Sequence, residues 1–248
     1  MRATRPVIGL AAAIGLWWAA VALFDIQPLF LPAPPDIVDA FVRQGPYLAQ
    51  QAGLTVGHTL AGFGIASGLG LAVAIALAAF PTVREAVLPL LVAAQAVPKV
   101  AFAPLLIVWL GFGAPSKVAM VALLSFFPVV VAALAGLTAT PAELADLARS
   151  LSATRWQAFR KIRIPYALPQ IFTGLKLAMS LALIGAVVAQ ITTPNAGLGA
   201  VIVRSGQSAD TPLAFAAITL LAALGIAGFY TLVGIEKIII PWASATTV

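Results

Sequence analysis

The chain has 248 residues, of which 62% are hydrophobic and only 9% charged, whereas soluble domains have roughly 45–50% apolar and about 25% charged residues. This composition excludes a soluble globular protein and indicates an all-α, polytopic membrane protein. The absence of cysteine excludes disulfides, thiolate metal sites and cysteine nucleophiles, and the net charge of +6 comes from sparse basic residues rather than from a basic, aromatic surface for nucleic acid.

Six apolar segments are long enough to cross a membrane, because a helix rises about 1.5 Å per residue and the hydrocarbon core is about 30 Å thick. They are Val7–Phe24, Leu60–Phe80, Ala86–Leu110, Val118–Leu137, Ala167–Ala189 and Leu213–Ile235. The first follows a basic start, as in a signal peptide, but no clear cleavage site precedes Asp25. We therefore expect an uncleaved first span and one membrane domain over residues 1–248.

The two sides of these spans differ in positive charge. With the N-terminus inside, the cytoplasmic segments hold Arg2, Arg5, Arg84, Arg149, Arg155, Arg160, Lys161, Arg163 and Lys237. The external segments hold only Arg43, Lys117 and Arg204. Because cytoplasmic loops carry the excess of Lys and Arg, we expect both termini and the loop at residues 138–166 to be cytoplasmic.

Residues 25–56, between the first two spans, are too short and too polar to cross. Leu31-Pro32-Ala33-Pro34 opens this stretch, and apolar residues then recur among polar ones. We expect an external amphipathic helix that lies along the bilayer surface or against the other spans. The next span, Leu60–Phe80, is rich in glycine and alanine, which predicts close packing between helices.

The third segment is the least regular and is the first candidate for a pathway through the membrane. Pro89, Pro98 and Pro104 each remove a backbone donor, and Lys99 follows Pro98 directly. Broken backbone at membrane depth is tolerated where it is buried or lines a cavity, and an ionisable residue within a span indicates a functional site. Alternatively, Lys99 reaches a headgroup layer and the prolines only kink a packing helix. The pathway candidates are Gln95, Pro98 and Lys99, with Phe126 and Phe127 beside a predicted kink at Pro128.

The loop at residues 138–166 is polar and helical in character. Thr140 and Pro141 open it with residues typical of a helix N-terminus. Trp156 and Phe159 are three residues apart and therefore share a helix face. Such an apolar face on a polar loop contacts a partner protein, which we favour, or packs back on the spans.

The same loop carries a spaced motif: Asp146-Leu147-Ala148, then Ser152, then Ile162, Ile164 and Pro165. It resembles the cytoplasmic motif of ABC importer permeases (Glu-Ala-Ala, three residues, Gly, nine residues, Ile-x-Leu-Pro), and the likeness to this binding-protein-dependent family extends from Leu31 to Trp242. The resemblance implies a type I (MetI-like) permease of six helices, in which the loop forms two short, angled coupling helices that dock in a groove of an ATP-binding subunit. It assigns this contact to Asp146, Leu147, Ala148, Ser152, Ala153, Arg155, Trp156 and Phe159.

Three positions depart from the family motif. Asp146 replaces Glu and keeps the negative charge, and Leu147 replaces Ala. Ser152 replaces Gly, which adopts φ > 0 without steric cost, whereas Ser does so less readily. The bend at Ser152 could therefore be built differently in this chain.

The fifth span carries Lys176 and Gln190. Lys176 faces a cytoplasmic gate or, as we favour, snorkels to the inner headgroups. Family members commonly have Glu where Gln190 stands, so a role that needs charge there is lost or moved, and Gln190 is a further pathway candidate. Gly197-Leu198-Gly199 resembles a turn of the family and precedes a short apolar segment that receives a binding protein or caps the pathway.

No lysine of the chain lies in a phosphate-binding Gly-x-x-x-x-Gly-Lys-Ser/Thr loop. We therefore expect no enzyme activity and no cofactor or metal in this chain, with ATP and magnesium bound by a partner. The resemblance implies two ATP-binding subunits, a second permease subunit that makes a homodimer, membrane lipid, and a periplasmic or lipid-anchored solute-binding protein, at a bacterial inner membrane.

The substrate stays open between the sulfonate, taurine and nitrate class and aromatic compounds such as thiamine pyrimidines. The alternative function is an ion-coupled secondary transporter, which needs acidic or His residues within spans. The Asp and Glu residues here fall in loops or at span ends. An intramembrane enzyme would need a nucleophile and base that the spans do not offer.

Overall fold

The computed structural model describes residues 4–242, except for the side chains of residues 4–7, 10, 145, 147 and 149. Within this part the chain is helical and has no strand. Its contacts divide it into two units: Met1–Val56 with Gln190–Ala223, and Gly57–Ala189 with Leu224–Val248.

Four helices of the described chain are long and apolar enough to cross a membrane. They are α2 (Pro34–Ala79), α5 (Ala114–Thr138), α10 (Thr211–Ile239), and a continuous run of α7 (Arg155–Ala158), the π-helical turn η2 (Phe159–Arg163) and α8 (Ile164–Thr192). A bent pair, α3 (Pro81–Ala96) and the 3₁₀ turn η1 (Lys99–Phe102) with α4 (Ala103–Leu110), meets at an angle of 82° and makes a fifth candidate if the pair counts as one span. The expected all-α membrane fold is confirmed.

The first expected span, Val7–Phe24, corresponds to α1 (Thr4–Leu23). The apolar helix described there, Ala11–Leu23, is shorter than the helices that can cross. A membrane crossing by this segment therefore stays a prediction. In the same unit the Trp17 ring packs against Phe215 of α10, with 5.9 Å between ring centroids.

Helix α2 begins at Pro34 and consists of two helices that meet at a kink at Gln44, where the backbone leaves helical geometry two residues before Pro46. The first of the two lies within residues 25–56, where we expected a separate helix, and the second continues into the second span. The apolar side chains of residues 25–56 lie on both sides: Ile37 and Leu48 are buried, whereas Val38 and Val42 are exposed. An amphipathic helix along the bilayer surface stays a prediction.

In the second unit, close approaches at glycine show that α2 and α5 run parallel. A Cβ added at Gly62 would lie 2.5 Å from the side chain of Val121, and one added at Gly70 would lie 2.9 Å from Val129. From the first contact to the second, the residue number rises in both helices. Because parallel neighbours need a returning connection, the bent α3–α4 pair must cross back between them, which supports its count as one span.

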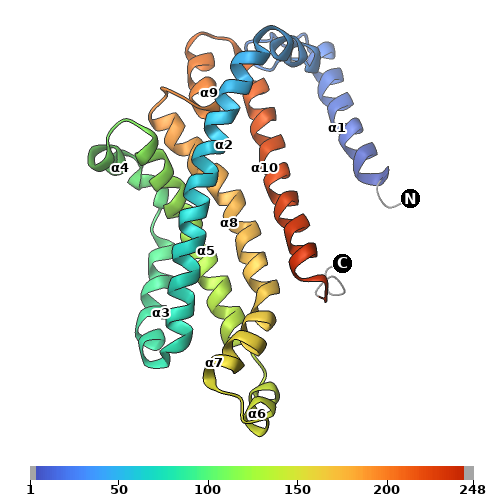
Figure 1. Ribbon diagram of the computed structural model, residues 1–248. Helices are drawn as coiled ribbons and strands as arrows, with labels where there is room; N and C mark the ends of the chain where they lie inside the picture. Colours follow the sequence, from blue (N-terminus) through green and yellow to red (C-terminus); the bar gives the residue numbers. More distant parts are fainter. Residues whose placement is uncertain (1–3, 243–248) are drawn as a thin grey trace. The chain divides into compact units, whose positions relative to one another are not determined.

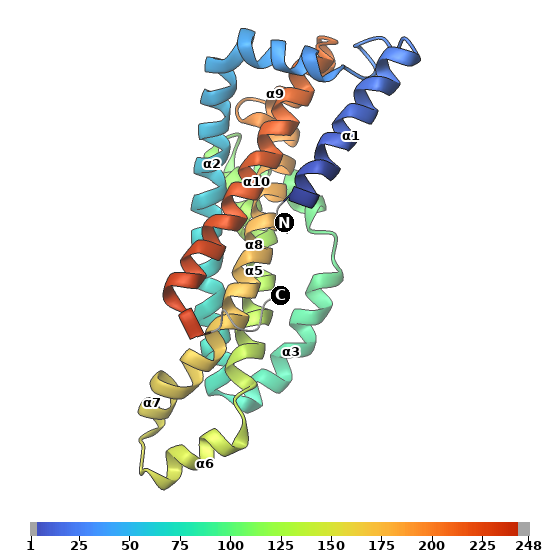
Figure 2. The ribbon, with the colours of Figure 1, turned by 90° about the vertical axis from the view of Figure 1, so that its right-hand side faces the viewer.

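The other neighbouring helices of this unit, α5 with α8 and α8 with α10, run antiparallel. Gly174 and Gly185 of α8 approach Ala132 and Val121 of α5, in reversed order, and α5 and α8 lie side by side in both views (Figures 1 and 2). Gly228 of α10 approaches Met179 of α8. Small residues thus let backbones pack closely where lipid provides no hydrophobic attraction between helices.

The expected break in the third segment lies at Val97 and Pro98, which are extended between α3 and η1. Proline disfavours helical geometry in the residue before it and lacks the N–H for the helical ladder. In contrast, α5 continues as one helix through Pro128, where we had predicted a kink.

Candidate functional site

The candidate site is the elbow between α6 (Ala142–Ser150) and α7. α6 ends in a Schellman motif, in which Ser152 has φ = 54° and the Ala153 N–H donates to the Ala148 carbonyl over 2.9 Å. This bond satisfies a carbonyl that the end of the helix would otherwise leave without a partner.

Immediately after this turn, Thr154 caps the next helix. Its hydroxyl accepts from the Gln157 N–H at 3.2 Å, and its own N–H donates to Gln157 Oε1 at 2.8 Å, which is a complete capping box. Only Ala153 separates the two capped ends. The sequence of hydrogen bonds therefore fixes the angle of the elbow.

The serine at position 152 keeps the positive φ that the family glycine would supply. We expected that the bend at Ser152 could be built differently, and its backbone geometry shows that this expectation is wrong. Such a conformation costs a residue with a Cβ roughly 1–2 kcal/mol. The replacement changes the stability of the elbow rather than its path.

A Ser152→Gly variant should make the elbow more stable by about 1 kcal/mol, which slows local opening about fivefold. Ser152→Val should speed opening, because a β-branched residue is strained at positive φ. Hydrogen exchange of the Ala153 amide measures both. The matched control is Ser150→Gly, the same exchange inside α6, which should speed opening. Equal exchange rates at position 153 in all variants would contradict this account of the bend.

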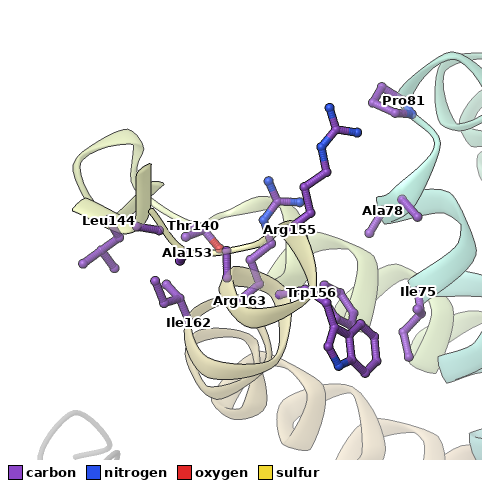
Figure 3. A pocket seen from close by; sticks show the side chains of 14 residues that line it. Ile75, Ala78, Pro81, Thr140, Leu144, Ala153, Arg155, Trp156, Ile162 and Arg163 are labelled. Carbon is purple, nitrogen blue, oxygen red and sulfur yellow. The ribbon is translucent and has the colours of Figure 1, made fainter. Parts of the chain in front are cut away.

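A groove of about 920 Å³ runs between the elbow and the turn that joins α2 to α3 (Figure 3). Of the predicted coupling residues, Ala148, Ala153, Arg155, Trp156 and Phe159 line it. The residues that sequence reasoning missed are Ile75, Ala78, Ala79, Pro81, Thr140, Leu144, Ala158, Ile162 and Arg163. Those from α2 and α3 could not be found from the motif, because they are distant in sequence.

The rings of Trp156 and Phe159 stack, with 5.8 Å between centroids and 27° between planes. Trp156 is 66% exposed, whereas Phe159 packs against a core cluster that includes Leu134 and Ile171. Phe159 thus packs back on the spans, which is the alternative that we did not favour. Of these two rings, Trp156 is the one that presents a large apolar surface to a partner.

The other coupling candidates lie on α6. Asp146 is exposed and does not line the groove, and the side chain of Leu147 lies outside the described part of the structure. In Figure 3, Arg155 and Arg163 point toward the same side of the groove. The exposed groove wall therefore combines one aromatic ring with two cations.

Five of the six pathway candidates gather at the break in the bent span. Pro98 lies at the break itself, and Lys99 Nζ donates to the backbone carbonyl of Gln95 over 3.3 Å. The same ammonium lies 4.8 Å from the centroid of the Phe127 ring, which meets Phe126 edge to face at 5.3 Å. Lys99 therefore lies against the aromatic ring of Phe127.

Gln190 belongs to a different group, which caps the N-terminus of α9 (Leu198–Gln207). Three successive backbone N–H groups donate to side chains: Gly197 to Gln51 Oε1 (2.7 Å), Leu198 to Thr55 Oγ1 (2.9 Å) and Gly199 to Gln190 Oε1 (3.0 Å). Gln51, Thr55 and Gln190 are all buried. We call these three side chains the polar cap.

The polar cap explains the Gly-Leu-Gly sequence. Gly197 has φ = 100°, and a Cβ there would collide with Gln190. Gln190 contributes an acceptor oxygen, which glutamate would also supply, so its hydrogen bonds to the Gly199 N–H and the Thr55 hydroxyl need no charge. Sequence reasoning missed Gln51 and Thr55, whose spacing of four residues on a helix was the available signal.

Lys176 does not snorkel to headgroups, as we had favoured. Its Nζ lies 2.9 Å from Glu236 Oε2, and the two side chains are 16% and 19% exposed. The pair joins α8 to the last turns of α10, sixty residues away in sequence. It therefore holds two antiparallel spans together near the end from which α8 leaves the elbow.

Removing either charge should weaken the contact between α8 and α10. For Lys176→Met and for Glu236→Gln we expect a loss of about 1.5–3 kcal/mol, the range for a hydrogen bond to a charged group, because each variant leaves a half-buried partner without its counterpart. The double exchange Lys176→Glu with Glu236→Lys should recover most of it. Thermal unfolding in detergent measures this, with exposed Lys237→Met as the control. If the single variants melted like that control, the pair would contribute nothing.

With this geometry established, comparison with known proteins places the chain. Residues 65–241 match the family described as the binding-protein-dependent transport system inner membrane component. The riboflavin transport permease RibX of Chloroflexus aurantiacus is 36% identical, with 97% of this chain and 92% of the relative aligned.

Two further relatives are named for different substrates. The formylaminopyrimidine permease ThiX of Halalkalibacterium halodurans is 34% identical over 97% of this chain and 96% of its own. The taurine permease TauC of Escherichia coli is 30% identical over 96% and 90%, respectively. The chain belongs to the family of binding-protein-dependent inner-membrane permeases of ABC transporters.

Proposed function

We propose that this chain forms the translocation pathway of an ATP-driven importer for a small polar, anionic or aromatic nutrient delivered by a solute-binding protein. Two ATP-binding subunits drive a homodimer of the chain through the elbow. The observation that carries this proposal is the groove beside a bend capped on both sides, with Trp156 exposed on its wall.

The surface of the groove suits a protein partner. Tryptophan and arginine are the residues most enriched at energetic centres of interfaces, and Trp156, Arg155 and Arg163 all line it. An exposed aromatic residue supported from below by Phe159 is already held in place, which lowers the entropy cost of binding. The two cations favour a partner surface with carboxylates.

The helices beyond the elbow provide a mechanical connection. From Arg155 to Thr192 the chain is one continuous helical run, so a force on α7 acts directly on a membrane span. The π-helical turn η2 lies between them, and such turns occur frequently at functional positions. ATP hydrolysis in the partner would thus move α8.

The orientation of the chain in the membrane is supported by the helix ends that lie together in the second unit. The groove joins the α2–α3 turn to the elbow, and Glu236 near the end of α10 pairs with Lys176 of α8. These basic segments are the ones that the charge distribution assigns to the cytoplasm. We accordingly propose that both termini and the elbow face the cytoplasm.

The alternative, a secondary transporter, lacks its expected proton or ion carriers. Among the described side chains, the acidic groups of the span helices lie near the helix ends, and one of them, Glu236, is paired with Lys176.

Proteoliposomes distinguish the two functions. The permease should accumulate solute only when the ATP-binding subunit, internal ATP and the binding protein are all present. Omission of the ATP-binding subunit is the control. Uptake driven by a sodium or proton gradient in the permease alone would instead establish the secondary transporter.

A further inference from the structure

A second cavity, of about 750 Å³, lies in the unit that holds the bent span. Its lining is almost entirely apolar and includes aromatic residues from η1, α4 and α5. These are Phe102, Trp109, Phe126 and Phe127. The volume lies within the range of roughly 300–1,000 Å³ that is typical of small-molecule sites.

One cation contacts a residue of this cavity. Lys99 does not line the cavity, but its ammonium lies 4.8 Å from the centroid of the Phe127 ring, which does, and it donates to the Gln95 carbonyl. Among the side chains that the structure describes, no carboxylate pairs with Lys99. An ammonium has three N–H donors, so this group can still donate to a ligand.

The combination of rings and one cation selects a class of ligand. Aromatic side chains bind planar rings by stacking or edge-to-face contact, and a cation favours a ring face or an acceptor at the ring edge. A small zwitterion such as taurine would have to place two strongly hydrated charges against apolar walls, where only one of them finds a partner, and this desolvation is costly.

We infer that this cavity is the transport site for a planar, nitrogen-containing aromatic nutrient, whose carbonyl or anionic group is bound by Lys99 and whose ring packs between the aromatic side chains. This inference rests on the proposed function and narrows it to one of the two substrate classes. It makes Lys99 and Phe127 specificity residues of the permease itself.

Direct binding to the full chain in lipid nanodiscs tests the inference without the ATP-binding subunit. Equilibrium dialysis with labelled riboflavin, formylaminopyrimidine and taurine should show saturable binding of at least one ring compound, at least tenfold tighter than that of taurine. Lys99→Met should weaken this binding about tenfold, which corresponds to about 1.4 kcal/mol. Lys99→Arg should retain most of it.

The aromatic lining needs its own variants and controls. Phe127→Leu should also weaken binding about tenfold, and Trp109→Leu, at a position 65% exposed, tests the lining without disturbing the fold. The matched controls are Phe112→Leu and Lys237→Met, which lie outside the cavity and should bind like the unchanged chain.

Three outcomes would overturn the inference. Tighter binding of taurine than of both ring compounds would assign the site to the other class. Binding that is lost when lipid is added in excess would show an acyl chain as the occupant, and a change from dimer to monomer in Trp109→Leu would show a second copy. The proposed function fails separately, if the complete complex shows no ATP-dependent uptake of any of the three compounds.

Discussion

An Asp146→Arg variant should insert normally but no longer stimulate ATP hydrolysis by its partner subunit. Asp146 is exposed on α6, next to the capped bend, and is the charged position of the motif. In the proposed complex it faces a cation of the ATP-binding subunit, so reversal replaces attraction by repulsion. Loss of a charge pair at an interface costs about 2–5 kcal/mol, which means a decrease in coupling of about thirtyfold or more.

Co-purification and permease-stimulated ATPase activity measure this effect in detergent. Asp146→Asn should give an intermediate loss, because it removes the charge without reversing it. Asp39→Arg, on an exposed position of α2 in the other unit, is the matched control and should couple normally. Normal coupling by Asp146→Arg would remove this residue from the docking surface.

The second large effect is expected at the polar cap. Gln190→Leu removes the oxygen that accepts from the Gly199 N–H and from the Thr55 hydroxyl, both in a buried place. The Thr55 hydroxyl keeps the Gln51 carbonyl as an acceptor at 3.0 Å, so the Gly199 N–H is the buried group left without a partner. Such a group costs about 1–3 kcal/mol, and we expect a melting temperature lower by about 2–10 °C. Gln190→Glu keeps the acceptor and should lose much less.

Gly197→Ala should be at least as harmful as Gln190→Leu. It places a Cβ at φ = 100° and into the side chain of Gln190. Hydrogen exchange of the three capped amides, together with melting in detergent, measures both variants. Gln207→Leu, at an exposed glutamine of the same helix α9, is the control. If Gln190→Leu melted like Gln207→Leu, the cap would have no structural role.

Local chemistry made much of the fold predictable. The apolar segments predicted the spans, and Pro98 predicted the break, because its effects act on its own backbone and on the preceding residue. The coupling motif likewise located the elbow. Its capping pair, Thr154 and Gln157, is a contact between residues three apart and needs no tertiary information.

Contacts between distant segments could not be predicted in this way. The partner of Lys176 is sixty residues away, and the acceptors that cap α9 come from α2 and α8. For Ser152, intrinsic preference argued against positive φ, but the hydrogen bond from Ala153 to Ala148 outweighs it. Phe159 shares a helix face with Trp156, yet only the position of the core decides which ring is buried.

The central claim, that the elbow receives its energy from a separate cytoplasmic subunit, can be tested with single cysteines, because the chain has none of its own. Leu151→Cys lies in the elbow at a position 73% exposed, and Phe112→Cys, 78% exposed between α4 and α5, is the control. A bifunctional maleimide should crosslink Leu151→Cys, but not Phe112→Cys, to the ATP-binding subunit in membranes. Labelling of Leu151→Cys by an impermeant maleimide from outside intact cells, without that crosslink, would contradict the account.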